Sequence, residues 1–209
     1  MVGGRRPLMI LAALALLAPL TAGSAPAVAV EQVAPVTTAD RVLGRADAPV
    51  TVIEYASFSC HLCADWHQFV FPVFKQRLID TGQVRFVFRN LPTAPEQMSL
   101  PAAALARCAA PERFFDVAST LMRGQEAVLR GGTLDDWWAP AVAASGRTRA
   151  QIDACAATPA TRAAINRDIE SAHAAGANST PAFFVNGRRV TDRSLGGLEV
   201  AVRAARAER

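Results

Sequence analysis

The chain has 209 residues, of which 51% are hydrophobic, and it carries a formal net charge of +4 and four cysteines. This length allows one domain, or one domain with an insertion, and the apolar content suffices for a buried core. Two of the positive charges are Arg5 and Arg6, and the balance of about +2 that remains (4 minus 2) is too small to favour nucleic acid as a partner.

Residues 1–29 are predicted to be a signal peptide. The two arginines precede an apolar stretch over residues 7–20, and small residues then lead to an expected cleavage site after Ala29, with Ala25 as an alternative. No charge occurs from residue 7 to residue 30, so an uncleaved membrane anchor is the competing interpretation. In either case we expect an exported protein, whose cysteines meet an oxidising compartment.

An extended arm, a strand, a helix and a second strand are predicted next. Residues 30–48 show no periodicity and form the arm. Residues 49–56 are β-branched and almost entirely apolar, which is typical of a strand covered on both faces. A helix with an apolar stripe is expected over residues 60–80, with a kink or short break at Pro72, and a strand over residues 84–88. This order predicts a βαβ unit with parallel strands.

The middle of the chain is expected to be helical. Residues 95–157 are rich in alanine, and we find no convincing strand pattern in them. Thr158 and Pro159 are typical of a helix N-cap and of the first helical position. The helix that they begin is predicted to run to about residue 175, where a glycine follows.

The last part of the chain is predicted to form a hairpin and a final helix. Residues 181–185 and 188–191 are candidate strands, and the Asn-Gly pair between them favours a tight turn. A helix is expected over residues 195–207. The whole order is βαβ, a helical block, then ββα, which predicts an α/β fold in which a helical insertion separates two halves of a sheet.

Four cysteines in an exported chain allow three ways of forming two disulfides. Cys60 and Cys63 are three residues apart, which favours pairing between them and leaves Cys108 and Cys155 for each other. The alternative for the second pair is two buried free thiols.

Cys60-His61-Leu62-Cys63 lies where the first predicted strand leads into a helix. Two cysteines at this spacing share one face of a helical turn. At the helix N-terminus, free N–H groups and the helix dipole stabilise an anion, so the pKa of the Cys60 thiol should fall well below about 8.5. A thiol with a low pKa is a good leaving group, which makes the disulfide easily reduced and therefore oxidising. Cys63 should be buried.

A zinc site is the structural alternative to a redox pair. With Cys60 and Cys63, His67 lies on the same helical face and supplies a third candidate ligand. A zinc site needs four ligands, and no second Cys-x-x-Cys or His pair completes the set. We therefore expect neither a metal nor a cofactor. His67 is interpreted as a packing residue, and His173 as a solvated residue of its helix.

Two further features bear on the redox interpretation. Glu54 is an acid in an otherwise apolar strand, six residues before Cys60. It either faces solvent at the strand end or lies under the disulfide, where a buried carboxyl could exchange protons with Cys63, and the residues alone leave both open. Thr180 and Pro181 come directly before an apolar strand, and a cis bond between them would be a rare feature that spacing alone does not establish.

Taken together, these motifs resemble the DsbA-like branch of the thioredoxin superfamily. The matching segments are VIEYASFSCHLCADWH (residues 52–67), VRFVFRNLP (84–92), ARCA (106–109) and TPAFFVNG (180–187). The resemblance implies a thioredoxin-like core split by a helical domain, a cis Pro181 that faces the disulfide, and a functional rather than solvent-facing Glu54. It gives residues 49–94 and 158–209 as the halves of the core, and residues 95–157 as the insertion.

The resemblance also implies a mechanism. A substrate thiolate attacks the sulfur of Cys60 and displaces Cys63. The mixed disulfide then lies beside Pro181, where backbone groups of Thr180 can pair with the substrate chain. A second substrate thiolate releases Cys60, and a membrane partner of DsbB type restores the disulfide. The substrates would be reduced exported proteins in the periplasm, and we expect a monomer.

Departures from the family pattern concern the tuning of the disulfide. The best-known pattern has Pro and then His between the cysteines, whereas here His61 comes first and Leu62 second. His61 can still place positive charge near Cys60. Some relatives carry a second, structural disulfide in the helical region, which is the role that the resemblance implies for Cys108 and Cys155.

Three hypotheses on function remain. The leading one is a dithiol oxidase that acts on exported proteins. The first alternative is a reductase or isomerase on the same fold, although the predicted arm is too short for the dimerisation domain of dimeric isomerases. The second is a non-enzymatic binding or chaperone module with structural cysteines, which an exposed Cys63 or an ordinary pKa of Cys60 would favour.

Overall fold

The structure, a computed structural model, describes residues 1, 3–4 and 33–208. The apolar stretch of the predicted signal peptide, both candidate cleavage sites and residues 30–32 of the predicted arm lie outside these residues. Among the helices of the described residues, none combines the length and the apolar character that a membrane span requires.

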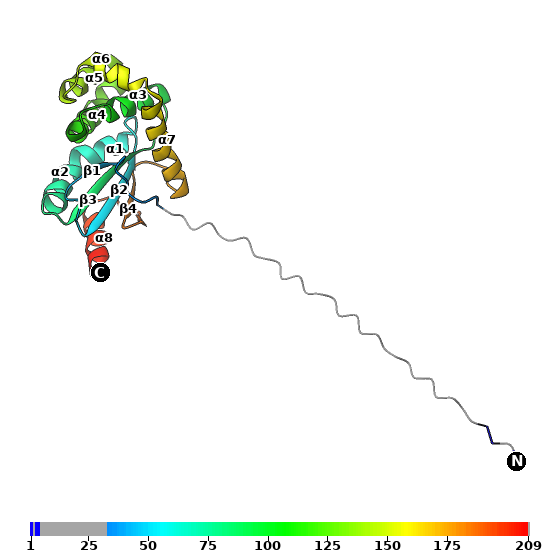
Figure 1. Cartoon of the computed structure of the whole chain (residues 1–209). Coiled ribbons are helices and arrows are strands. Elements are labelled where there is room, and N and C mark those ends of the chain that lie inside the picture. Colours follow the sequence, from blue (N-terminus) through cyan, green and yellow to red (C-terminus); the bar gives the residue numbers. More distant parts are fainter. Residues whose placement is uncertain (2, 5–32, 209) are drawn as a thin grey trace. The chain divides into compact units, whose positions relative to one another are not determined.

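A five-stranded mixed sheet forms the centre of the domain (Figure 1). The strands lie in the order β1-β3-β2-β4-β5, and only β2 and β3 run parallel to each other among these neighbours. Their bounds are Arg41–Leu43 (β1), Val50–Ala56 (β2), Val84–Asn90 (β3), Ala182–Val185 (β4) and Arg188–Val190 (β5). The predicted βαβ and ββα units are therefore confirmed.

The predicted arm contains a strand that the sequence analysis missed. β1 pairs antiparallel with Phe86–Phe88 of β3 at the edge of the sheet. The predicted extended arm thus contributes one short edge strand to the sheet, which was not foreseen. Three residues are too few to show a periodicity of two, and the partner strand lies more than 40 residues away in the sequence.

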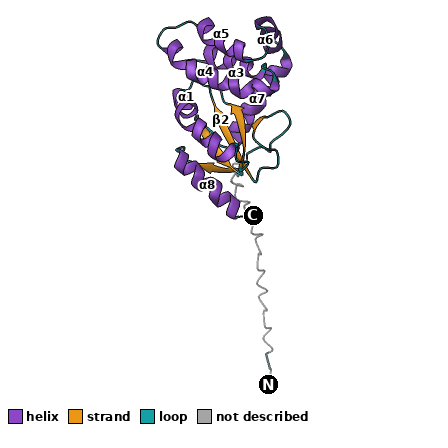
Figure 2. Ribbon diagram, turned by 90° about the vertical axis from the view of Figure 1, so that its left-hand side faces the viewer, coloured by secondary structure: helices purple, strands orange, loops and turns teal. Residues whose placement is uncertain are grey.

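Helices lie on both faces of the sheet and at one of its ends. Their bounds are His61–Asp65 (α1), Phe71–Phe74 (α2), Glu96–Arg107 (α3), Phe114–Leu129 (α4), Leu134–Ala144 (α5), Arg149–Ala156 (α6), Pro159–Ala174 (α7) and Leu195–Ala207 (α8). In Figures 1 and 2, α3 to α6 gather beyond one end of the strands. Residues 95–157 contain no strand, as predicted.

Each face of the sheet has its own apolar core, because side chains alternate along β2. Val50, Val52 and Ala56 belong to a cluster that also includes residues of α1, α2, α4 and α8. Ile53 and Tyr55 belong to a second, smaller cluster with residues of α7 and of the segment that precedes β1. Glu54 shares the face of the larger cluster, and this parity directs its carboxyl group toward α1.

The helix predicted over residues 60–80 is continuous but changes its winding. α1 is followed by a π turn at Trp66–Val70, then by α2, then by a second π turn at Lys75–Ile79. In the first π turn the N–H of Phe71 donates to the carbonyl of Trp66, five residues back. Pro72, which has no N–H to donate, follows directly. The kink or break expected at the proline is thus a change of winding that begins before it.

The first π turn carries two consecutive rings that are both buried. Here Trp66 and His67 are both buried, with exposed fractions of 4% and 5%. The indole N–H of Trp66 donates to the carbonyl of Arg193 at 3.0 Å. The wider turn therefore holds two consecutive rings in the core.

Candidate active site

Cys60 is the N-cap residue of α1, directly after the loop that follows β2. Its backbone is extended, with φ −85° and ψ 115°, and the N–H of Cys63 donates to its sulfur at 3.4 Å. The sulfur also lies 3.4 Å from the carbonyl oxygen of Thr180. The Thr180–Pro181 peptide bond is cis. The segment before β4 thus lies against the half-buried thiol at the start of α1.

The two thiols differ strongly in proton affinity. The pKa of the Cys60 thiol is lowered from 9.0 to about 6. The largest cause is a hydrogen bond from the Cys63 thiol; the Thr180 side chain and the N–H groups of Cys63 and Leu62 add to it, while partial burial acts in the opposite direction. Cys63 is fully buried, and its pKa is raised well above the usual value. Burial is the largest cause; the hydrogen bond and charge of Cys60 and the charge of Glu54 contribute less. Cys60 is therefore a thiolate at neutral pH, and Cys63 a thiol.

Glu54 lies inside the domain, with none of its surface exposed. Its Oε2 atom lies 2.8 Å from Nε2 of His67. The sequence interpretation with Glu54 facing solvent is therefore wrong. The alternative role, proton exchange with Cys63, stays a prediction.

Sequence reasoning missed the contact between His67 and Glu54. His67 packs against the rings of Phe71 and Phe88, as the packing interpretation expects, with centroid distances of 5.0 and 5.9 Å. Its hydrogen bond to a buried carboxyl is the part that was not foreseen. The available signal was its position four residues after Cys63, on the same face of the helix, which we considered only as zinc ligation.

The other predicted residues lie at the rim or outside it. His61 is exposed, and so is Leu62, with 43% of its surface accessible. Their effect on the redox properties of the pair stays a prediction. Phe69, in the π turn that follows α1, is 67% exposed. His173 is exposed on α7, as expected.

Cys108 and Cys155 are joined by a disulfide that connects the end of α3 to α6, with a Cα–Cα distance of 5.8 Å. The hydroxyl of Thr161 in α7 donates to the carbonyl of Cys155 at 2.9 Å. Cys60 and Cys63 are free thiols, so the structure represents the reduced form of that pair. The alternative of two free thiols at Cys108 and Cys155 does not apply to this structure.

Within the described part of the chain, no three His, Cys, Asp or Glu side chains gather so as to hold a metal ion. The zinc alternative required His67 to join the two cysteines, whereas this imidazole hydrogen-bonds Glu54.

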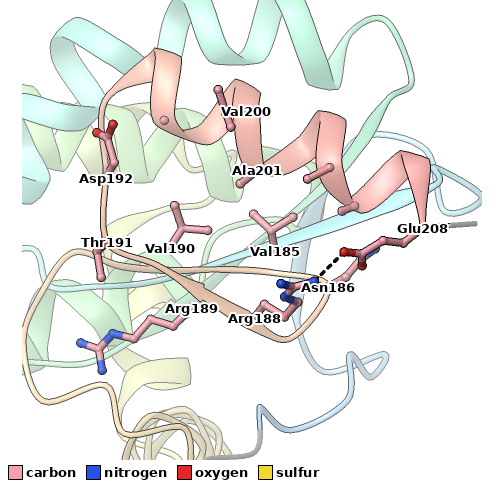
Figure 3. Close-up of a pocket in the computed structure, with 13 residues that line it drawn as sticks. Val185, Asn186, Arg188, Arg189, Val190, Thr191, Asp192, Val200, Ala201 and Glu208 are labelled. Atoms are coloured by element: carbon pink, nitrogen blue, oxygen red, sulfur yellow. Dashed lines mark hydrogen bonds and ion pairs between the residues drawn. The ribbon is translucent and has the colours of Figure 1, made fainter.

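A surface pocket of about 330 Å³ lies between the β4–β5 hairpin and α8 (Figure 3). Val185, Val190 and Val200 contribute apolar surface to it, and an ion pair of 2.6 Å joins Arg188 to Glu208 at its edge. None of the residues around the two thiols lines this pocket. We therefore place the candidate active site at the start of α1 rather than here.

The Cys60 thiol of the reduced protein is expected to titrate near pH 6, as followed by the ultraviolet absorbance of the thiolate. Its pKa in the folded protein lies below the ordinary value of 9.0, so ionisation stabilises the reduced folded state. This contribution is complete above about pH 9 and is lost as the pH falls through about 6. The Cys60→Ser variant should lose the transition, and a midpoint near 9 in the wild-type protein would contradict the geometry described above.

Comparison with known proteins places the chain in a family. The family model described as Thioredoxin matches residues 36–203. The Na⁺/H⁺ antiporter NhaA 3 of Salinispora tropica is 32% identical over 154 residues, which are 72% of this chain and 22% of that protein. A putative protein-disulfide oxidoreductase of Rickettsia bellii is 41% identical over 69 residues, which are 33% of this chain and 26% of that protein. The matches thus span about a quarter of these curated relatives.

Among solved structures, α-DsbA1 of Wolbachia pipientis superposes with a TM-score of 0.72 at 24% sequence identity, over 83% of this chain and 94% of that one. This likeness concerns the fold, which includes the helices between the two halves of the sheet. With a family model that covers most of its length, the chain belongs to the thioredoxin family, in the DsbA-like form of that fold.

Proposed function

We propose that this protein is an exported thiol–disulfide oxidoreductase that acts as a dithiol oxidase, donating the Cys60–Cys63 disulfide to reduced proteins. The observation that carries the proposal is the asymmetry of the two thiols. Cys60 is half-buried and has a pKa of about 6, whereas Cys63 is fully buried and its pKa is raised by burial. An incoming thiolate can reach the first sulfur and not the second.

The reaction requires two thiolate attacks in succession. A substrate thiolate attacks Sγ of Cys60, a bond forms between these two sulfurs, and the Cys60–Cys63 bond breaks with its electron pair on Cys63, which takes up a proton. A second thiolate of the same substrate then attacks the substrate sulfur of the mixed disulfide. Cys60 leaves as a thiolate, the substrate is oxidised to a disulfide, and the protein is left as a dithiol.

The low pKa of Cys60 favours oxidation of the substrate over its reduction. A thiolate that is stabilised in the reduced protein lowers the free energy of the reduced form, which shifts the equilibrium toward transfer of the disulfide to the substrate. It also makes Cys60 the better leaving group in the second step. The same properties disfavour a purely structural role for the pair, since structural cysteines keep ordinary or raised pKa values.

We further propose that the substrate chain lies along Thr180 and Pro181, whose segment contacts the Cys60 sulfur. Backbone groups of Thr180 would pair with it, and the exposed Leu62, between the two cysteines, offers apolar surface for its side chains. The substrates would be reduced proteins that share the periplasm with this one. A DsbB-type membrane protein would reoxidise the pair.

The reduction potential of the Cys60–Cys63 pair tests the proposal. The protein is equilibrated in glutathione buffers, quenched by alkylation, and the two redox states are counted by peptide mass spectrometry, which separates this pair from Cys108–Cys155. We expect a value near about −120 mV, typical of a strong oxidant. A value near about −270 mV would instead support the reductase alternative.

A further inference from the structure

The buried carboxyl of Glu54 and the imidazole of His67 form an isolated polar pair beneath the candidate active site. The cross-strand neighbours of Glu54 in the sheet are Phe88 in β3 and Phe183 in β4. The carboxyl group thus leaves the sheet among aromatic rings, and its Oε2 meets Nε2 of His67 at 2.8 Å. A buried ionised carboxylate is costly in such surroundings unless a partner shares or supplies a proton.

This pair is not saturated with hydrogen bonds. Oε1 of Glu54 and Nδ1 of His67 are both buried, and neither has a hydrogen-bond partner among the residues that the structure describes. An imidazole that uses one nitrogen and a carboxyl that uses one oxygen retain sites at which a proton can be added or removed. Buried polar atoms are nearly always paired, so two unpaired atoms on one hydrogen-bonded pair require an explanation.

Cys63 is the buried titratable group of α1, and it lies four residues, or about one turn, before His67. It is buried in the larger apolar cluster, on the same face of β2 as Glu54. The ring of His67 packs against Trp66, Phe71 and Phe88. The pKa of Cys63 is raised mainly by burial. The hydrogen bond and charge of Cys60 raise it further, and the charge of Glu54 adds a smaller effect. The cross-strand neighbours of Glu54, Phe88 in β3 and Phe183 in β4, carry no charge.

His67 lies beside Glu54 in a π turn, an uncommon form of helical winding. His67 belongs to the π turn that buries it together with its neighbour Trp66. Single π turns within α-helices occur frequently at functional sites. Both rings of this turn lie in the core, since Trp66 and His67 are 4% and 5% exposed.

We propose that His67 is a positioning residue that, with Glu54, holds the proton that Cys63 takes up and returns in each redox cycle. This inference rests on the proposed thiol–disulfide exchange. When a thiolate attacks Cys60, Cys63 leaves with the electron pair of the broken S–S bond, and one proton passes from the pair to its sulfur. On reoxidation, Cys63 gives the proton back to the pair as its sulfur attacks Cys60 in a mixed disulfide with the oxidising partner.

The test measures how fast dithiothreitol reduces the Cys60–Cys63 disulfide from pH 5 to 9, with rates expressed per dithiothreitol thiolate. His67→Gln keeps a hydrogen-bonding side chain of similar reach but cannot hold an extra proton. We expect its rate to fall about a hundredfold at neutral pH, the low end of what positioned proton transfer contributes, and to become sensitive to buffer concentration. Glu54→Gln should show the same loss, and the double variant no larger one, because the two residues act as one unit.

Trp66→Phe is the matched control, since this ring packs against His67 and forms no hydrogen bond to Glu54. It should lower the melting temperature and leave the pH profile unchanged. If His67→Gln fails to fold, the reduction rates of Glu54→Gln and Trp66→Phe are compared instead, and the inference requires the first to fall and the second to keep the wild-type pH profile. A wild-type profile in His67→Gln, losses that multiply in the double variant, or an equal slowing in Trp66→Phe would each overturn the inference. The assay uses no protein substrate, so failure of the oxidase proposal appears separately, in the reduction potential.

Discussion

Replacing Cys60 with serine is expected to reduce the oxidation of a reduced, unfolded protein to the uncatalysed rate, a loss of several orders of magnitude. A serine hydroxyl cannot form the mixed disulfide, and Cys63 is fully buried, so no other thiol of this pair is accessible to the substrate. The measurement is the rate at which enzymatic activity returns to a reduced test protein after addition of a stoichiometric amount of the wild-type protein or the variant, each treated beforehand with the same oxidant. Below about pH 6 ionisation of the Cys60 thiol no longer stabilises the reduced fold, so the melting temperature of the variant should there differ little from that of the reduced wild-type protein. At higher pH the variant should be the less stable of the two.

Cys63→Ser is the matched variant and has a different expected result. It retains the low-pKa thiol at Cys60, with the N–H of residue 63 still available to the sulfur. It cannot store a disulfide and so cannot donate one, but it should react with glutathione disulfide and accumulate a mixed disulfide at Cys60. Residual oxidase activity in Cys60→Ser, or no mixed disulfide in Cys63→Ser, would show that Cys60 is not the sulfur attacked by substrates.

Reduction of the Cys108–Cys155 disulfide is expected to lower the free energy of unfolding by about 4 kcal/mol. The two residues are separated by 47 positions in the sequence, and the chain-entropy model gives about this value for a loop of that size. The bond links α3 to α6, so its loss frees the ends of the helical segment in the unfolded chain.

The experiment is best performed in a Cys60→Ser/Cys63→Ser background, where this is the remaining cysteine pair. Urea unfolding is then compared with and without reductant on one and the same sequence, so that no side chain is removed and no cavity is created. The wild-type fold should persist in the reduced form at low temperature. A difference below about 1 kcal/mol would mean that strain in the folded state offsets the entropic gain.

Local chemistry explains which parts of the fold could be predicted. The final helix has the predicted bounds, Leu195–Ala207. Thr158 caps α7 by accepting from the N–H of Thr161, and Asn186 and Gly187 both have positive φ values, 46° and 82°. Capping and tight turns depend on residues that are adjacent in the sequence, so their signatures are readable without knowledge of the fold.

What the sequence did not reveal depends on contacts made at a distance. β1 forms by pairing with the edge of β3, and the sequence of its three residues, Arg41–Leu43, does not indicate this partner. The contact of Glu54 with His67 joins a strand to a π turn, and no periodicity in the sequence indicates that turn. The two thiols, by contrast, could be placed from their spacing and their position at the start of a helix.

The π turn at Trp66–Val70 lies between α1, which begins directly after Cys60, and the rest of the long helix. Upstream, the residues between the thiols are exposed; downstream, Phe74 and Leu78 anchor the helix in the core. We therefore expect substitutions at His61 and Leu62 to leave the buried part of the helix in place, since neither side chain belongs to the core. Any redox tuning by these two residues would then be separable from the stability of the fold.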